Sequence, residues 1–314
     1  MMNAMKRLAT VAVFCVSIVA ALKYGAIQPI AAQENTVKKI NLYATDGYVK
    51  MPDGSDMYIW GYSLQNEKGT AVYPAPTLEV TEGDQVEITL TNIGPSKSGI
   101  LPVAHTIHFH GLNTNQKNDG VPHTSLPVFV GKSFTYQFKA QYAGTYFYHC
   151  HVDTVEHLQM GMTGSFIVKA REGVNQAWTE GPSYDKEVVL HLNEIDRSWH
   201  KAVEQRQTYD RTVFNPDFWA LNGEFSGKNA KTSITAKAGE TYLIRLINSG
   251  YQKHTFHMNG RQFKVIASDG RPLQKSLNKQ SLTLASAERY DVLVKFDQAG
   301  TYTIHVDGEE SKPR

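Results

Sequence analysis

Cysteine is scarce in this sequence of 314 residues, which contains only two. Cys15 lies in the apolar N-terminal stretch, and Cys150 lies near the middle of the chain. If the N-terminal stretch is removed on export, the remaining chain has one thiol and an internal disulfide is excluded. A single thiol in an exported protein indicates that the thiol is occupied by something else, and a metal ion is the interpretation developed below.

The net charge is also small, and long hydrophobic runs are few. The formal charge of +2 gives no argument for a nucleic-acid partner or an acidic substrate. The N-terminal apolar run, Leu8 to Leu22, is shorter than the roughly 20 residues of a membrane-spanning helix. Because Lys6 and Arg7 precede this run, it predicts a signal peptide over residues 1–32 and a periplasmic or extracellular protein with no membrane attachment after cleavage. An uncleaved anchor is the alternative.

Helix-like periodicity is also sparse, whereas alternating segments separated by Gly and Pro are frequent, which predicts an all-β fold. The expected strands are 40–44, 57–62, 74–91 with a break at Glu82-Gly83-Asp84, 133–138, 144–149 and 164–170. Residues 194–207 do not alternate and are expected to form a loop with a helical turn.

Three segments of the first half return in the second half in the same order. Residues 232–248 resemble 76–92, H-T-F-H at 254–257 resembles H-T-I-H at 105–108, and A-G-T-Y at 299–302 repeats 143–146. Such a duplication predicts two Greek-key β-sandwich domains. Their predicted limits are 37–170 and 185–308, joined by a linker over 171–184.

The central motif is Y-H-C-H-V-D-T-V-E-H-L-Q-M-G-M, residues 148–162. It contains Cys150, His157 and Met162, and a second histidine, His105, precedes it in the chain. Two His, one Cys and a weak Met are the ligands of a blue-copper site. Met160 is the competing axial ligand, and we prefer Met162 because a strand follows it directly.

Strand parity sorts the remaining histidines. Neighbouring residues of a strand point to opposite faces, so Cys150 faces away from His149 and His151. His105 falls on the face opposite to His108 and His110 by the same rule. The pattern predicts two metal sites back to back, the second one with His108, His110, His149 and His151. A zinc site would more often show several cysteines, and a set this large is poorly explained as structural histidines.

The motifs H-T-I-H-F-H-G, D-G-V-P-H and G-T-Y-F-Y-H-C-H resemble the multicopper oxidase family over nearly all of residues 40–308. The resemblance implies cupredoxin-like domains, a type 1 copper that accepts electrons from a reductant, and a type 2/type 3 copper cluster that reduces dioxygen. Two-domain members are typically homotrimers with clusters between subunits. By position, the implied type 1 ligands are His105, Cys150, His157 and Met162, and the implied cluster ligands are His108, His110, His149, His151, His257 and His305. Asp119 resembles a family acid that assists proton delivery, although a plain turn residue is an equal interpretation.

The second half departs from the family pattern at three positions. Asn259 and Asp307 stand where the family has histidines, and Val306 replaces the second cysteine. A complete cluster is therefore in doubt. His110, His149 and His305 also resemble the catalytic copper site of nitrite reductases, but those enzymes usually lack histidines at positions 108 and 151.

Three hypotheses for function follow, namely an oxidase that uses dioxygen, a nitrite reductase, and an electron carrier with the type 1 copper alone. We rank the oxidase first because both H-x-H and H-C-H are complete in the first half. The reductant stays open among small organic molecules, metal ions and redox proteins.

Overall fold

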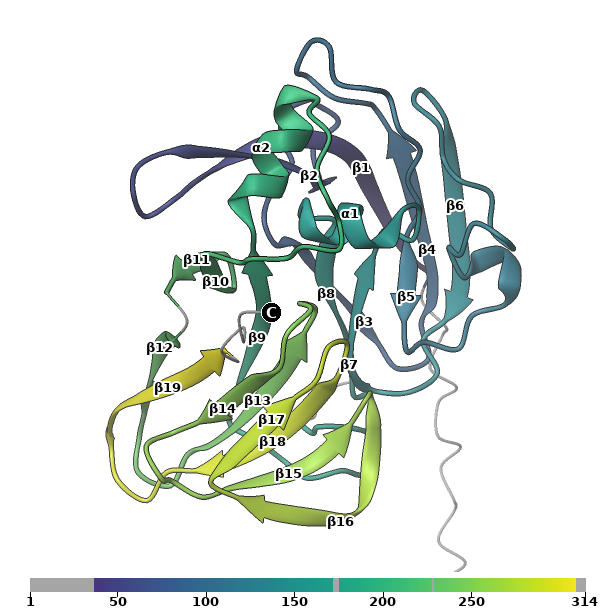
Figure 1. Cartoon of the computed structure of the whole chain (residues 1–314). Helices are drawn as coiled ribbons and strands as arrows, with labels where there is room; N and C mark the ends of the chain where they lie inside the picture. Colours follow the sequence, from purple (N-terminus) through teal and green to yellow (C-terminus); the bar gives the residue numbers. More distant parts are fainter. Residues whose placement is uncertain (1–36, 172–174, 228, 309–314) are drawn as a thin grey trace, which may run out of the picture. The chain divides into compact units, whose positions relative to one another are not determined.

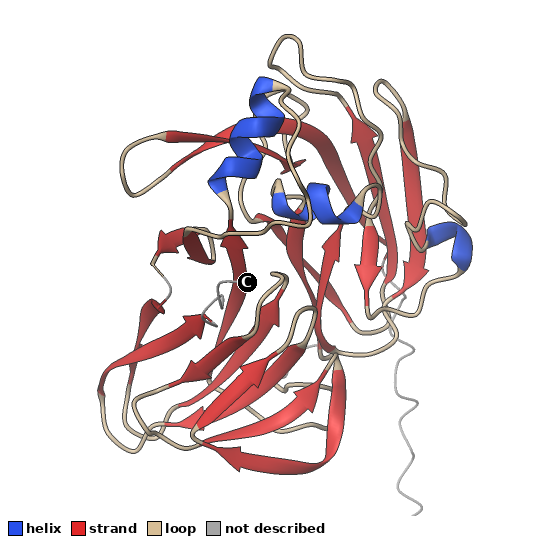
Figure 2. Ribbon diagram, in the orientation of Figure 1, coloured by secondary structure: helices blue, strands red, loops and turns tan. Residues whose placement is uncertain are grey.

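The computed structural model describes residues 37–171, 175–227 and 229–308, and strands make up 51% and helices 7% of these residues (Figure 2). The all-β fold class is therefore confirmed. The signal peptide predicted over 1–32 lies outside the described residues. Within the described ranges, no helix is both long and apolar enough to cross a membrane.

The first half of the chain forms two four-stranded sheets (Figure 1). One has the order β2-β1-β4-β6 and the other β3-β8-β7-β5. The bounds are β1 Val37–Lys50, β2 Asp56–Ser63, β3 Ala75–Thr81, β4 Gln85–Asn92, β5 His108–His110, β6 Ser133–Lys139, β7 Gly144–His149 and β8 Thr163–Lys169. Each strand expected in this half is present, and the break at Glu82-Gly83-Asp84 is the turn between β3 and β4.

The second half repeats this plan with one sheet of seven strands and one of four. Their orders are β11-β10-β9-β13-β18-β15-β16 and β12-β19-β14-β17. The bounds are β9 Lys186–Ile195, β10 Phe218–Leu221, β11 Glu224–Ser226, β12 Asn229–Ala236, β13 Thr241–Asn248, β14 His254–His257, β15 Phe263–Ser268, β16 Arg271–Lys279, β17 Ser281–Leu284, β18 Arg289–Lys295 and β19 Gly300–Gly308. The segments that echo each other become equivalent strands, since β14 and β19 pair as β5 and β7 do.

Alternation explains why each half closes into a sandwich. Along β4, every second residue from Val86 to Leu90 is buried, and the inward residues of both sheets meet in one apolar core that also contains Cys150. A second core forms in the same way around Ile244, Phe256 and Val292. Each sandwich therefore has its own core, while the boundaries of the two domains stay a prediction.

The described residues contain three short helical segments, namely η1 Gln116–Asn118, α1 Thr154–Gln159 and α2 Arg197–Gln205. For residues 194–207 we expected a loop with a helical turn, but nine of these residues form the helix α2. The side chain of Asp196 accepts a hydrogen bond from the Ser198 amide at its N-terminus, and Trp199 and Ala202 bury one face. This one-sided burial at a spacing of three residues is the helical signal that the strand-based interpretation missed.

The outward face of β7 packs on the second sandwich within the single compact unit of residues 35–314. Phe147 of β7 contacts Ile247 of β13 in a shared apolar cluster. Beside it, the fully buried Arg245 guanidinium lies 3.3 Å from Asp291 and donates to Thr145 of β7 at 3.1 Å. Buried ions are costly unless paired, so this group fixes how the two sandwiches meet.

We expect Asp291→Asn to lower the free energy of unfolding by about 3 kcal/mol, because it removes one counter-charge from the buried Arg245. Chemical denaturation at neutral pH measures this change. The matched control is Asp56→Asn, which removes a carboxylate that pairs with Lys50 at 2.8 Å, with both side chains more than half exposed; we expect an effect below about 1 kcal/mol. Equal effects of the two substitutions would contradict this account of the interface.

Candidate metal centres

Three of the predicted ligands converge around Cys150, the residue that follows β7. The Cys150 sulfur lies 3.1 Å from His157 Nδ1 and 3.8 Å from His105 Nδ1. All three residues are buried, and their ligand atoms lie within 4.8 Å of one another. A thiol and two imidazole nitrogens in one buried cluster fit a soft, nitrogen- and sulfur-preferring ion such as copper.

Separate backbone elements position the three ligands. His105 is held by paired backbone hydrogen bonds with Val128, at 3.1 and 2.8 Å. His157 lies on the short helix α1, and the Thr106 amide donates to the Cys150 sulfur at 3.4 Å. Because an amide hydrogen bond to sulfur favours the thiolate, the loop after His105 prepares Cys150 for a metal.

Met162 is fully buried in the same core as Cys150. Its amide donates to the His157 carbonyl at 3.0 Å, and its carbonyl accepts from the Cys150 amide at 3.1 Å. The residue is therefore tied to both neighbouring ligands. Met160 is equally buried, and its carbonyl accepts from the Trp60 amide. The choice of Met162 as axial ligand stays a prediction.

Burial controls protonation in this cluster. Desolvation raises the pKa of the Cys150 thiol to about 11, in spite of the amide hydrogen bond. Desolvation also lowers the pKa of His157 to about 4 and that of His105 well below its usual range. At neutral pH both imidazoles are therefore uncharged and ready to bind a metal, and only the thiol proton has to leave.

The second predicted site forms on the opposite side of β7. Ligand atoms of His108, His110 and His149 lie within 4.8 Å of one another. Nδ1 of His108 lies 2.7 Å from the Asp119 carbonyl, and Nδ1 of His149 lies 2.9 Å from the Cys150 carbonyl. A hydrogen bond at Nδ1 leaves Nε2 of each ring available to a metal. His110 Nδ1 lies 3.4 Å from His149 Nε2.

His151 joins this histidine group from the end of β7. Its ring centroid lies 5.3 Å from that of His108 and 5.8 Å from that of His149. The four rings line a pocket of about 270 Å³ that Ser249 and Tyr251 of the second sandwich complete. Desolvation lowers the pKa of His110 to about 4 and that of His149 to about 3, so these rings are also uncharged at neutral pH.

The predicted ligands of the second half lie apart from this group. The rings of His257 and His305 stack with centroids 4.9 Å apart, and neither belongs to the His108 cluster. Nε2 of His305 is buried and has no hydrogen-bond partner among the described residues, which suits a nitrogen that binds a metal ion.

The two replaced positions differ in their surroundings. Asp307 accepts a hydrogen bond from His257 Nε2 at 2.9 Å. Asn259 is exposed in a turn past the end of β14 and has a positive φ of 49°. Asp307 is therefore the one of the two that touches a predicted ligand.

The remaining candidate residues have structural surroundings. His254 Nε2 lies 2.5 Å from Glu194 in the core. His191 is buried and hydrogen-bonded through both ring nitrogens to Ser165 and Ser249. Asp119 places its carboxylate 3.6 Å from His108 Nδ1, while its proton-delivery role stays a prediction.

Sequence reasoning missed the residues that enclose the Cys150 site. The Trp60 ring packs edge-on against His157 with centroids 5.1 Å apart, and against His105 at 6.2 Å. Arg211, from the second half, binds Asp153 at 2.6 Å and Glu156 at 2.7 Å, both at the N-terminus of helix α1. No local sequence pattern predicts these contacts, because they join segments that are distant in sequence.

Comparison with known families finds a match in each half of the chain. Models described as "Multicopper oxidase" match residues 52–173 and 186–314. Both halves of the chain therefore match the same family description.

The matches with individual relatives cover only part of each relative's length. A copper-containing nitrite reductase of Neisseria gonorrhoeae is 27% identical over 85% of this chain and 63% of its own length. Laccase-18 of Oryza sativa is 30% identical over 73% of this chain and 38% of its own. The chain thus spans between about a third and two thirds of these curated relatives. The crystal structure of a blue copper oxidase from Nitrosomonas europaea superposes with a TM-score of 0.67 at 28% identity, covering 84% of this chain and 77% of that one.

Copper(II) binding to the copper-free protein should release about one proton per chain near pH 7.5, because only the Cys150 thiol is protonated among the clustered ligands. Since the thiol pKa of about 11 lies above this range, affinity at the Cys150 site should rise about tenfold per pH unit between pH 6 and 8. Calorimetry in buffers of different ionisation enthalpy counts the protons. Cys150→Ser should bind copper only at the histidine site, without proton release; release from that variant would refute the assignment.

Proposed function

This chain belongs to the multicopper oxidase family, whose members bind copper, and we propose that it is an exported oxidase that takes single electrons from a reductant at the Cys150 site and delivers them to dioxygen at the histidine site. The observation that carries the proposal is the back-to-back arrangement of the two ligand clusters on β7. His105, Cys150, His157 and Met162 would hold the type 1 copper. When bound, copper supplies one-electron chemistry by cycling between its cuprous and cupric states.

The chain itself keeps water away from the Cys150 site and connects that site to the histidine site through few covalent bonds. The buried Cys150 cluster excludes water, while His149 and His151 are its covalent neighbours and line the second pocket. An electron leaving Cys150 therefore meets ligands of the second site after one residue in either direction. Asp119, whose side chain accepts a hydrogen bond from Thr114, is the nearest acid for proton supply to His108.

A copper nitrite reductase is the alternative function. Its support is the His110 and His149 pair together with His305, and the similarity to a curated relative of that name. Against it stand His108 and His151, which lie in the same pocket and give the site more imidazoles than one copper needs. Asn259 and Asp307 replace two of the histidines that hold three coppers in the family pattern. The number of coppers per chain therefore decides between the alternatives.

Cys150→Ser should abolish the intense visible absorption of a thiolate-bound copper and reduce turnover at least about a thousandfold, because the entry site for electrons is lost. The experiment measures copper per chain, the visible spectrum, and both oxygen uptake and nitrite reduction with one reductant. Three or four coppers with oxygen uptake support the oxidase, and two coppers with nitrite turnover support the reductase. One copper without turnover makes the chain an electron carrier, and a colourless copper-loaded wild type refutes the type 1 assignment.

Assembly follows from the separation of His257 and His305 from the first-half histidines. Each chain then carries the two parts of one site on different surfaces, and a closed ring of identical chains joins unlike surfaces around its axis. We propose a homotrimer with the histidine site between subunits.

His305→Ala should leave the blue Cys150 copper intact while lowering the copper content of the histidine site and the turnover at least about a hundredfold. Light scattering and copper analysis on the same sample measure mass and loading together. The control is His123→Ala, an exposed histidine outside both clusters, which should change neither. A monomer with full copper content and full turnover would rule out the shared site.

A further inference from the structure

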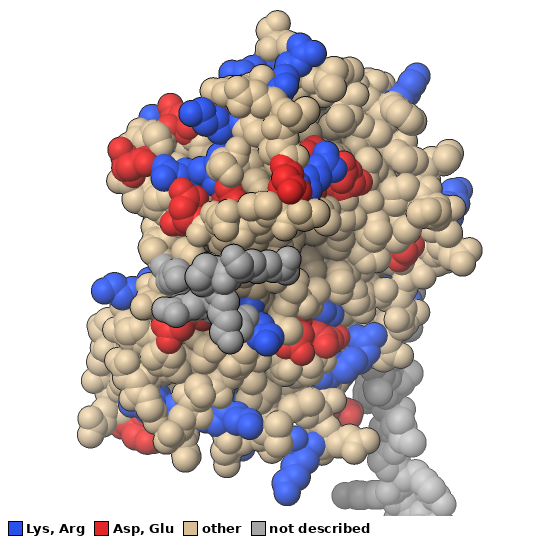
Figure 3. Space-filling view, viewed as in Figure 1, with Lys and Arg blue, Asp and Glu red and all other residues tan. Residues whose placement is uncertain are grey.

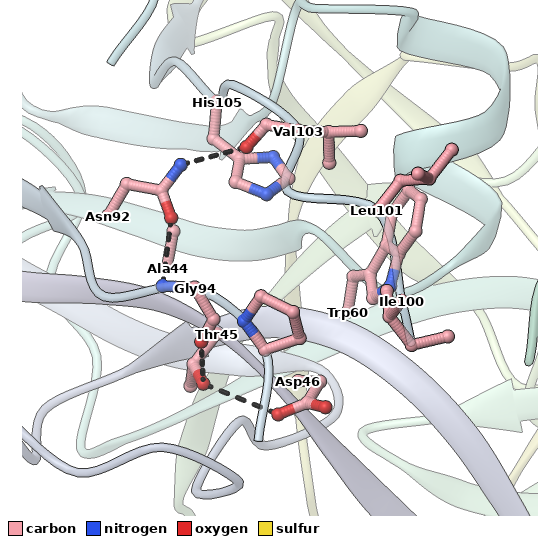
Figure 4. A pocket seen from close by; sticks show the side chains of 11 residues that line it. Ala44, Thr45, Asp46, Trp60, Asn92, Gly94, Ile100, Leu101, Val103 and His105 are labelled. Carbon is pink, nitrogen blue, oxygen red and sulfur yellow. Dashed lines mark hydrogen bonds between the residues drawn. The ribbon is translucent and has the colours of Figure 1, made fainter. Parts of the chain in front are cut away.

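The Cys150 cluster is closed to solvent in the part of the chain that the structure describes. The exposed fractions are 0% for Cys150, 2% for His157 and 6% for His105. A cavity of about 10 Å³ borders His105, and Ile100 and Leu101 lie among the residues that line it (Figure 4). A cavity of this size holds at most about one water molecule, so a hydrated metal ion reaches the thiol only if part of the chain moves.

Helix α1 is the part of this enclosure that is least stable by itself. It carries His157 and has only six residues, a length at which isolated helices are unstable in water. Asp153, which precedes it, has a φ of 44° and makes no side-chain capping hydrogen bond. A left-handed backbone is unfavourable for a residue with a side chain. The closed position of α1 therefore depends on contacts with other segments.

The N-terminal end of α1 is held by residues 207–217, the connection between α2 and β10, which we call the strap. Arg211 of the strap binds the carboxylates of Asp153 at 2.6 Å and Glu156 at 2.7 Å. The Tyr209 hydroxyl also donates to Glu156. Acidic and basic side chains accordingly lie side by side over α1 on the face drawn in Figure 3.

The strap is a fixed support, because it is hydrogen-bonded to α2 and to the residue that caps this helix. Nε1 of Trp199 donates to the Val213 carbonyl at 2.9 Å, and the Asn215 amide donates to the Asp196 carboxylate at 2.8 Å. Arg211 and Asp153 are both more than two fifths exposed, however, and exposed ion pairs contribute little free energy each. The attachment of α1 to the strap is therefore weak enough to break and re-form in the folded protein.

The C-terminal end of α1 is attached to the interior instead. The Gln159 side chain donates to the Glu194 carbonyl at 3.0 Å, and the Trp60 amide donates to the Met160 carbonyl at 2.9 Å. Gly161 follows with a φ of 115°, a conformation open to glycine. Opening of α1 therefore begins at its N-terminal end, where the strap binds it.

We propose that Arg211 is a positioning residue for the Cys150 cluster, which holds α1 closed so that His157 stays beside Cys150 and metal exchange is slow. When its ion pairs break, α1 moves away from Cys150 and the thiol meets solvent. A copper ion then replaces the thiol proton, which leaves to solvent, and α1 closes again. Opening needs no metal, whereas the exchange of copper rests on the proposed function.

The first test measures the reaction of Cys150 with 2,2′-dithiodipyridine in the copper-free protein, in a Cys15→Ser background that leaves one thiol. The rate is proportional to the population of the open form when opening and closing are fast. Arg211→Gln should raise the rate about fivefold, and adding Tyr209→Phe should raise it at least about tenfold. Arg211→Lys keeps the charge and should restore part of the protection. An unchanged rate in both Arg211→Gln and the double variant would overturn the proposal.

The matched control is Arg197→Gln, because Arg197 also binds two carboxylates, those of Asp53 and Asp217, each at 2.5 Å and neither on α1. We expect it to leave the labelling rate unchanged. Hydrogen exchange of residues 150–162 should accelerate in Arg211→Gln by the same factor as labelling, while exchange of β13 stays at the wild-type rate. Equal acceleration of both segments, or an equal effect of Arg197→Gln, would show that Cys150 reacts through global unfolding and would contradict the proposal.

The second test uses the copper-loaded protein and a chelator. Release of copper from the Cys150 site, followed by loss of the visible absorption, should accelerate in Arg211→Gln by the same factor as labelling of the copper-free protein. Faster labelling of a protein that shows no visible absorption when loaded would overturn the proposed function and leave the role of Arg211 in opening intact. Copper release at the wild-type rate, in a variant whose labelling accelerates, would overturn its role in metal exchange.

Discussion

The two-residue period of β7 is the constraint on which the site depends. Tyr146, Tyr148 and Cys150 point into the core of the first sandwich, while Phe147 and His149 point outward. One short segment thus provides the packing face between the sandwiches, the buried thiol and an imidazole of the second site. A shift of register by one residue would exchange these roles, so the pairing of β7 with β5 and β8 protects both sites at once.

Much of the fold and of the candidate site can be predicted from local sequence patterns. The strands and the division of the histidines into two clusters depend on alternation within a strand, and the clusters around Cys150 and His149 agree with it. The duplication depends instead on three segments that return in the same order. The nine-residue helix α2 was underestimated because it is short and mostly polar. Trp60, Arg211 and Arg245 gave no signal at all, since each acts through contacts with segments far away in the chain, and parity within one strand says nothing about which other strand covers it.

The second sandwich supports the Cys150 cluster from outside. Its His254, equivalent to the predicted ligand His105, binds the buried Glu194, whose carboxylate also accepts from the amides of Tyr251 and Gln252. That loop completes the histidine pocket, and Arg211 and Tyr209 hold helix α1 from outside. The second half thus shapes the surroundings of the Cys150 cluster, while Val306 stands at its own position equivalent to that cysteine.

The pairing of β3 with β8 has a consequence for the order of folding. These parallel neighbours are separated by most of the first half of the chain, so this sheet closes only after residues 163–169 have emerged from synthesis or translocation. Until then the Cys150 thiol remains outside the core, and afterwards it has no exposed surface. Copper bound at the proposed Cys150 site would therefore enter during that interval or through local opening of residues 150–162, in kinetic competition with closure of the core.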